Sequence, residues 1–184
     1  MKVLNINPRY PGARNDAYIW SMSPICRAAE FHYNRGERRT WLIGDAGYPL
    51  EPWLMTPLVG FPEDTRQFQY TEQLCKARSI VERFFGVFKA IWRCLSYQRV
   101  LMYEPAFAAR IVNACAVLHN MRIQHRLPLE EFEEPVAAYH HENADPMNVN
   151  EAVVQRGPRA VAQRIQRQIM RERFPNFRDA EGEE

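Results

Sequence analysis

The strongest constraint on the fold is one amphipathic segment, residues 78–95, with the sequence RSIVERFFGVFKAIWRCL. Its large apolar residues recur at helical spacing and so predict a helix with one buried stripe; they are Val81, Phe84, Phe85, Phe88, Trp92 and Leu95. Arg78, Glu82 and Lys89 fall within about 40° of one another on the same helical projection. This charged line borders the buried stripe. Alone, it indicates either an exposed ion-pair face or one side of a functional site.

Further elements are predicted around this helix from periodicity and from the positions of proline and glycine. Residues 2–7 and 40–43 are predicted strands, residues 17–35 and 105–126 are predicted helices, and residues 158–174 are a predicted basic helix. Residues 51–75 contain three prolines and are predicted to be irregular. The order of these elements favours an α/β fold with fewer strands than a self-sufficient sheet needs.

Charge divides the chain into three parts. Residues 1–126 hold 17 Lys and Arg against 10 Asp and Glu, whereas residues 127–150 hold six acids and no Lys or Arg. We therefore expect a basic domain at 1–126, an acidic linker at 127–150, and a basic helix with an acidic tail at 151–184. Arg outnumbers Lys by 21 to 3, which favours bidentate contacts with phosphate and makes nucleic acid a compatible partner. The basic helix has three open interpretations: a DNA contact, a partner contact or a solvated face.

The cysteines and the apolar runs limit the class of protein further. Four cysteines are widely spaced without a C-x-x-C pair, so neither a disulfide framework nor a zinc pattern is predicted. This usage favours a reducing intracellular compartment, with Cys94 and Cys115 as small core residues. No apolar run approaches the roughly 18 residues of a membrane span, and no signal peptide is visible.

Four segments, taken in order, resemble the nuclease domain of PIF/Harbinger-type transposases and the transposase-derived nuclease that animals retain from that family. They are YPGARNDAYIWSMS (10–23), LIGDAGYPLEPWLMTPL (42–58), ARSIVERFFGVFKAIWRCL (77–95) and IVNACAVLHNMRI (111–123). The most specific part is G-D-x-G-Y-P-L followed by R-x-x-x-E-R-x-F-G-x-x-K. The resemblance implies an RNase H-like DDE nuclease core within residues 1–126, followed by a helical C-terminal part.

The resemblance also implies a carboxylate site for divalent cations, Mg²⁺ or Mn²⁺. Asp45 matches the central Asp of the family, Glu82 its final Glu, and Asp16, in P-G-x-x-x-D, a further candidate ligand. Arg78 and Lys89 match basic positions that flank the Glu and would balance the carboxylates or contact phosphates. Two such ions about 3.5–4 Å apart can activate water and stabilise the leaving oxygen of a phosphodiester. Taken singly, Asp16 also suits a helix cap, Asp45 a turn and Glu82 a surface acid.

The resemblance implies a divalent-metal-dependent endonuclease that acts on DNA phosphodiester bonds in the nucleus, with the cytoplasm left open. The family's first Asp lies on a strand upstream of every motif seen here, so we expect this chain to be N-terminally truncated, incomplete in its sheet and impaired in catalysis. The alternative is a domesticated, non-catalytic protein that binds DNA or a Myb-like partner. A homo-oligomer is left open, and no membrane partner is expected.

Overall fold

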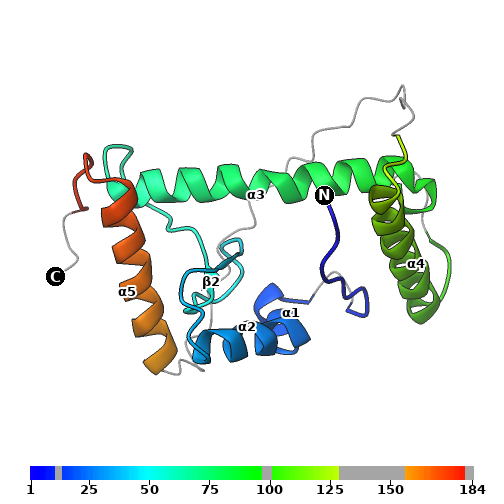
Figure 1. The fold of residues 1–184 in the computed structure, drawn as a ribbon, viewed down its shortest axis with the longest axis horizontal. Helices are drawn as coiled ribbons and strands as arrows, with labels where there is room; N and C mark the ends of the chain where they lie inside the picture. The colour runs from blue at the N-terminus through cyan, green and yellow to red at the C-terminus, as the bar shows by residue number, and fades with distance from the viewer. Residues whose placement is uncertain (11–13, 97–100, 129–155, 181–184) are drawn as a thin grey trace. The chain divides into compact units, whose positions relative to one another are not determined.

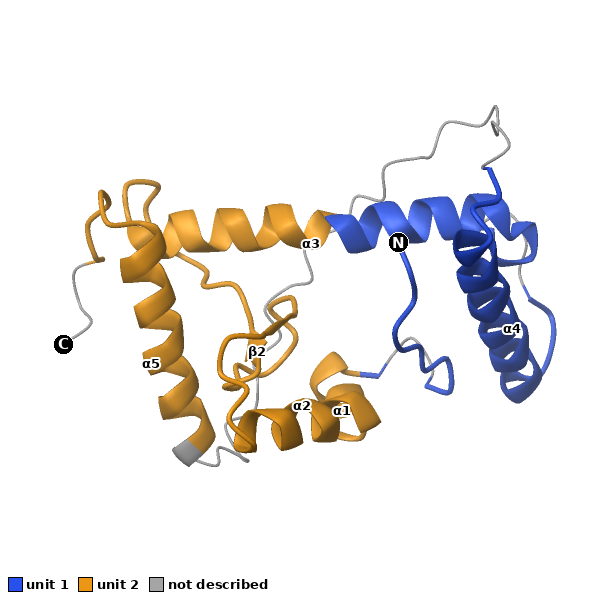
Figure 2. Ribbon diagram, in the orientation of Figure 1, with its two compact units in different colours: residues 1–14, 80–141 blue, residues 15–79, 142–184 orange. Residues whose placement is uncertain are grey.

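The computed structural model describes residues 1–10, 14–96, 101–128 and 156–180. Its elements are α1 (Asp16–Ser21), α2 (Pro24–Asn34), β1 (Leu42–Ile43), β2 (Leu54–Met55), α3 (Arg66–Ile91), the 3₁₀ helix η1 (Arg93–Leu95), α4 (Pro105–Gln124) and α5 (Arg156–Arg173) (Figure 1). They form two compact units (Figure 2): unit 1 comprises residues 1–14 and 80–141, and unit 2 comprises residues 15–79 and 142–184. The described part of the chain is thus mixed helical with a small sheet, compatible with an incomplete α/β domain of the DDE type.

The sheet lies in unit 2 and consists of β1 and β2 in parallel, with Leu42 opposite Leu54. The amide of Leu42 donates to the Trp53 carbonyl at 2.9 Å, and the amide of Gly44 donates to the Met55 carbonyl at 2.9 Å. β1 confirms the strand predicted at 40–43, although it is shorter. β2 lies inside the segment predicted to be irregular, because Pro52 and Pro57 flank its two residues closely and indicate a loop.

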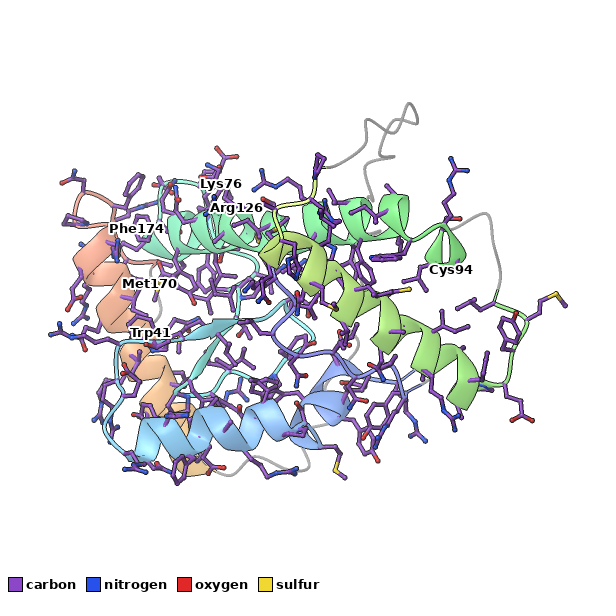
Figure 3. All side chains as sticks on the ribbon, turned by 45° about the vertical axis from the view of Figure 1, so that its right-hand side comes forward. Trp41, Lys76, Cys94, Arg126, Met170 and Phe174 are labelled. Atoms are coloured by element: carbon purple, nitrogen blue, oxygen red, sulfur yellow. The ribbon has the colours of Figure 1, made fainter. Side chains whose placement is uncertain are left out.

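Strand β2 is almost completely buried: Leu54 is 2% exposed and Met55 3%. Leu54 packs with Trp20, Tyr33 and Trp53. Met55 belongs to a second cluster, whose members include Tyr70 and Leu74 of α3, Met170 of α5, and the partly buried Trp41 and Phe174 (Figure 3). The basic helix predicted at 158–174 is confirmed by α5, and its apolar stripe packs into this core. None of the three open interpretations of that helix included this packing.

A buried polar contact joins α5 to the end of β2. Gln166 Nε2 donates to the Thr56 carbonyl at 3.0 Å and to Tyr70 Oη at 3.3 Å, and the Tyr70 hydroxyl donates to the same carbonyl at 3.3 Å. The carbonyl and the two side chains are thereby hydrogen-bonded away from water, which removes the cost of burying them unpaired.

The helix predicted over residues 17–35 is wrong as a single element, because it is broken before Pro24. The proline has no amide hydrogen and occupies the first turn of α2, while Ser23 caps that helix by accepting from the Ile25 amide at 3.1 Å. Asn15 caps α1 by accepting from the Ala17 amide at 2.8 Å. The capping role that the sequence allowed for Asp16 therefore belongs to Asn15.

Helix α3 begins at Arg66 rather than at residue 78, so the predicted irregular segment is wrong over its last part. Thr65 Oγ1 accepts from the Phe68 amide at 3.3 Å, which caps this earlier start. In unit 1, Phe88 packs with Cys115 and Ala116 of α4, and α4 confirms the helix predicted at 105–126. Val81 and Phe85 remain nearly half exposed, so the predicted stripe is only partly buried.

The strand predicted at residues 2–7 is wrong: these residues are irregular, and a side chain rather than a strand pairs with them. The Val3 amide donates to Asn120 Oδ1 at 2.8 Å, and Asn120 Nδ2 donates to the Val3 carbonyl at 2.8 Å. His119 Nε2 lies 3.0 Å from the Met1 carbonyl oxygen. The Asn120 amide thus makes the two hydrogen bonds that a neighbouring strand would make.

Most of the predicted acidic linker, residues 127–150, lies outside the described residues, so the division into residues 1–126, 127–150 and 151–184 stays a prediction. No helix in the described ranges combines the length and apolarity that crossing a membrane would require.

The paired hydrogen bonds of Asn120 predict a local effect of its replacement. Asn120→Ala leaves the Val3 amide and carbonyl without these partners, and we expect a loss of about 1–3 kcal/mol in unfolding free energy. Urea denaturation measures that loss, and hydrogen exchange of the Val3 amide should accelerate. Asn113→Ala, an exposed change on the same helix, is the matched control. Equal Val3 exchange in both variants would contradict the proposed pairing.

Glu51 makes the folding stability of unit 2 depend on pH. Burial raises the pKa of its carboxyl above the ordinary value of 4.5 and nearby Glu30 also raises it, while the hydrogen bond from Trp20 Nε1, at 2.7 Å from Oε2, lowers it. Because the pKa is raised in the folded state, the folded chain binds this proton more tightly than the unfolded chain does. The stability that this contributes is fully present below pH 4.5 and is lost as the pH rises through the folded-state pKa.

Glu51→Gln keeps an oxygen that can accept from Trp20 but does not ionise. We expect the difference in melting temperature, variant minus wild type, to become more positive as the pH is raised from about 4 to about 7. Thermal denaturation at several pH values, with the exposed Glu63→Gln as control, measures this gain. A constant difference between variant and wild type would show that Glu51 has the same pKa in both states.

Candidate functional site

Asp45 lies two residues after the end of β1, at the carboxyl end of the strand, where α/β folds commonly place binding sites. Both its side chain and its backbone carbonyl shape the turn. The Gly47 amide donates to Asp45 Oδ1 at 2.9 Å, and the Tyr48 amide donates to the Asp45 carbonyl at 3.2 Å. Gly44, immediately before it, is buried, and a methyl group there would lie 2.9 Å from Tyr48 Cβ. A glycine at this position therefore lets the turn close tightly over the strand end.

Asp16, the first residue of α1, approaches the same turn. A methyl group placed on Gly47 would lie 3.2 Å from Asp45 Oδ1 and 3.4 Å from Asp16 Oδ2. The two carboxylates, 29 positions apart in the sequence, thus both reach the space beside Gly47. This position bears no side chain of its own, so the carboxylates rather than a side chain of residue 47 line that space.

Arg78 brings a positive charge to this pair from α3. Its Nη1 lies 3.0 Å from Asp45 Oδ2, and the two side chains are 21% and 39% exposed, respectively. A pair that is partly withdrawn from water is screened less than a fully exposed one. The ion pair therefore orients the Asp45 carboxylate and offsets part of the repulsion between the two acids.

Tyr48 completes what we call the Asp45 cluster: Asp16, Asp45, Tyr48 and Arg78 around Gly47. Burial raises the pKa of the Tyr48 hydroxyl, the negative charges of Asp16 and Asp45 raise it further, and Arg78 lowers it. Its ring meets Trp20 edge to face, with centroids 6.1 Å apart. Tyr48 is not among the site residues predicted from the sequence, although it stands in the same G-D-x-G-Y-P-L motif as Asp45.

Glu82 and Lys89 lie on the part of α3 that belongs to unit 1. Glu82 follows Arg78 by one helical turn, so the two occupy neighbouring positions on one side of the helix. Joint membership of Glu82 and Lys89 in a site with Asp16 and Asp45 stays a prediction. Within residues 1–10, 14–96, 101–128 and 156–180, no group of three or more His, Cys, Asp or Glu side chains is arranged to hold a metal ion.

The Asp45 cluster nevertheless has the right chemistry for part of such a site. Carboxylate oxygens are the ligands that Mg²⁺ and Mn²⁺ prefer, and two of them face the space beside Gly47. Further oxygen ligands would be needed to fill an octahedral shell. The donor set of Asp16 and Asp45 therefore fits a divalent cation as a partial site.

Comparison with known proteins defines the class to which this fold and cluster belong. The family model described as "DDE superfamily endonuclease" matches residues 1–120. The chain belongs to this family, and the match confirms the resemblance to transposase-derived nucleases that the four motifs indicated.

Individual relatives point in the same direction. The chain is 29% identical over 124 residues to "Putative nuclease HARBI1" of Bos taurus, covering 67% of this chain and 34% of the relative. The protein of the same name from Xenopus laevis is 38% identical over 93 residues, 50% of this chain and 26% of the relative. "Protein ALP1-like" of Arabidopsis thaliana is 27% identical over 133 residues, 67% of this chain and 32% of the relative. The chain thus spans about a third or less of the length of these curated relatives. No solved structure matches it.

The electrostatics of the Asp45 cluster predict a shift at Tyr48. Asp45→Asn removes one negative charge and the partner of Arg78, so the pKa of the Tyr48 hydroxyl should fall toward its ordinary value. An NMR titration of the chain labelled with ¹³C-tyrosine, in a buffer containing a chelator, measures that pKa. The control is Asp64→Asn, an exposed acid of unit 2 that pairs with Arg178 at 2.7 Å. An unchanged Tyr48 pKa in Asp45→Asn would contradict the proximity of the two side chains.

Proposed function

We propose that this chain carries the carboxylate site of a transposase-derived, divalent-metal-dependent nuclease of the RNase H-like DDE type, acting on DNA in the nucleus. The observation that carries the proposal is the approach of Asp16 and Asp45 to one point beside Gly47, with Arg78 paired to Asp45. It is supported by membership in a family described as endonucleases and by relatives whose printed names say nuclease.

Each residue has a proposed role in that site. Asp16 and Asp45 would hold Mg²⁺ or Mn²⁺, and Glu82 is proposed as the third carboxylate from its motif and from its place one turn after Arg78 on α3. When bound, the cation would supply the charge that activates water and stabilises the leaving oxygen. Arg78 orients Asp45 and places a positive charge beside it, where a DNA phosphate would be attracted. Lys89 is proposed to contact phosphate further along the helix.

Tyr48 has a proposed supporting role within the same arrangement. Its partly buried ring packs edge to face against the core residue Trp20, and the charges of the two acids raise the pKa of its hydroxyl. A ring in that position limits the access of water to the Asp45 carboxylate and strengthens the electrostatic interactions there. Tyr48 would therefore act as a positioning residue rather than as a catalytic one.

The test is cleavage of supercoiled plasmid by the full chain in Mn²⁺ or Mg²⁺. Because the sequence predicts impaired catalysis in this chain, we expect weak nicking that is lost with a chelator and that falls by about ten- to a hundredfold or more in Asp16→Asn, Asp45→Asn and Glu82→Gln. Mn²⁺ binding, followed by electron paramagnetic resonance, should weaken in parallel. Glu72→Gln, which removes an acid of α3 paired with Lys76 at 2.9 Å, is the matched control and should nick like the wild type.

Two results would overturn the proposal. Nicking that persists in all three site variants would come from elsewhere in the preparation or the chain. DNA that is bound but left intact in both metals would favour the alternative, a non-catalytic protein that binds DNA or a Myb-like partner.

A further inference from the structure

Helix α5 has two opposite faces, and only one of them packs against the core of unit 2. Ala162 is fully buried, and Gln166 and Met170 are 3% exposed, so these side chains face the core. Arg164, Arg167 and Arg171 are all exposed, and their spacing of three and four residues brings them within about 60° of one another on the opposite side of the helix. The packing therefore fixes which side of the helix carries this line of three arginines on the surface.

These three residues, which we call the arginine stripe, line a shallow hollow on α5 together with Gln168 and Glu172. Arg167 and Arg171 also line an adjoining hollow with Gln67, Met170 and Asp179. Within the described ranges, none of the three arginines forms an ion pair. The nearby acids have other partners, since Glu172 accepts from Gln168 Nε2 at 2.7 Å and Asp179 pairs with Arg66 at 2.7 Å.

Such a stripe has an energetic cost in the isolated chain. Like charges three and four residues apart on a helix repel one another and destabilise it. A polyanion removes that repulsion when it binds, and guanidinium groups make bidentate contacts with phosphate oxygens. The stripe is thus complementary to a repeating array of phosphates rather than to a single anion.

We propose that the arginine stripe of α5 is a docking surface for the phosphate backbone of duplex DNA, separate from the Asp45 cluster. Choosing DNA as the polyanion rests on the proposed function. A lipid surface fits less well, because membrane-bound helices present a broad apolar face beside their basic one. On the described part of α5 the one large apolar side chain with substantial exposure is Val161, at 37%.

The test is binding of a fluorescein-labelled duplex of random sequence to the full chain in a chelator, followed by fluorescence anisotropy at several salt concentrations. The variant is Arg164→Gln/Arg167→Gln/Arg171→Gln. Each phosphate contact contributes about 0.9 to the slope of log affinity against log salt, so the triple variant should lower that slope by between about 2 and 3. At low salt its affinity should fall by at least about tenfold.

The matched control removes the same charge elsewhere in unit 2. Arg27→Gln/Arg35→Gln/Arg39→Gln changes three exposed arginines on or just after α2 and should leave the slope nearly unchanged. Circular dichroism and thermal denaturation of both triple variants check the fold. If the α5 triple variant is unstable, Arg167→Gln alone should still lower the slope by about 0.9.

Three results would overturn the inference. Equal losses in the two triple variants would mean that the whole basic surface attracts DNA without a docking site. An unchanged slope in the α5 variants would place the contact elsewhere. Displacement of the duplex by polyglutamate of equal charge would indicate a surface for acidic proteins. Because binding is measured in a chelator, a failure of metal-dependent nicking alone would overturn the nuclease proposal and leave the docking surface standing.

Discussion

The short strand β2 must be covered by side chains from other elements, and the rest of unit 2 depends on this constraint. Two parallel strands of two residues each cannot shield their own apolar side chains or satisfy their outer carbonyl groups. Helices α3 and α5 meet both needs, since Met170 and Tyr70 pack on Met55 and Gln166 satisfies the Thr56 carbonyl. Because β1 is hydrogen-bonded to β2, this cover also fixes the strand end from which Asp45 projects.

The helices could be predicted where one apolar stripe dominates the pattern, as in α4 and the second half of α3. The apolar pattern of the sequence did not predict the structure where a segment pairs with a side chain or where only a cap marks the start of a helix. The segment that contains Val3 is short and rich in β-branched and other apolar residues, which predicts a strand, yet its partner is the side-chain amide of Asn120. The first turns of α3 mix polar and aromatic residues after several prolines, and only the capping Thr65 marks their start.

The candidate site was predictable as a set of residue types and not as a geometry. The motifs selected Asp16, Asp45 and Arg78, but only the tertiary fold shows that two of these acids share the space beside Gly47. Tyr48 carries no such signal, because the sequence alone does not show which side chains approach a tyrosine in a glycine- and proline-rich loop. Gln166 carries no signal either, because one polar residue on a basic helix does not indicate burial until its partners are known.

The assembly of unit 2 from two distant stretches of chain has a consequence for its synthesis. Residues 15–79 leave the ribosome well before residues 156–173, which form α5. Until α5 arrives, Met55 and Tyr70 lack Met170, and the Thr56 carbonyl lacks Gln166. Domains generally fold as units during translation, so completion of unit 2 waits for the C-terminal helix. The nascent chain therefore exposes part of its core from the emergence of residues 15–79 until the emergence of α5, the interval in which a chaperone would find it.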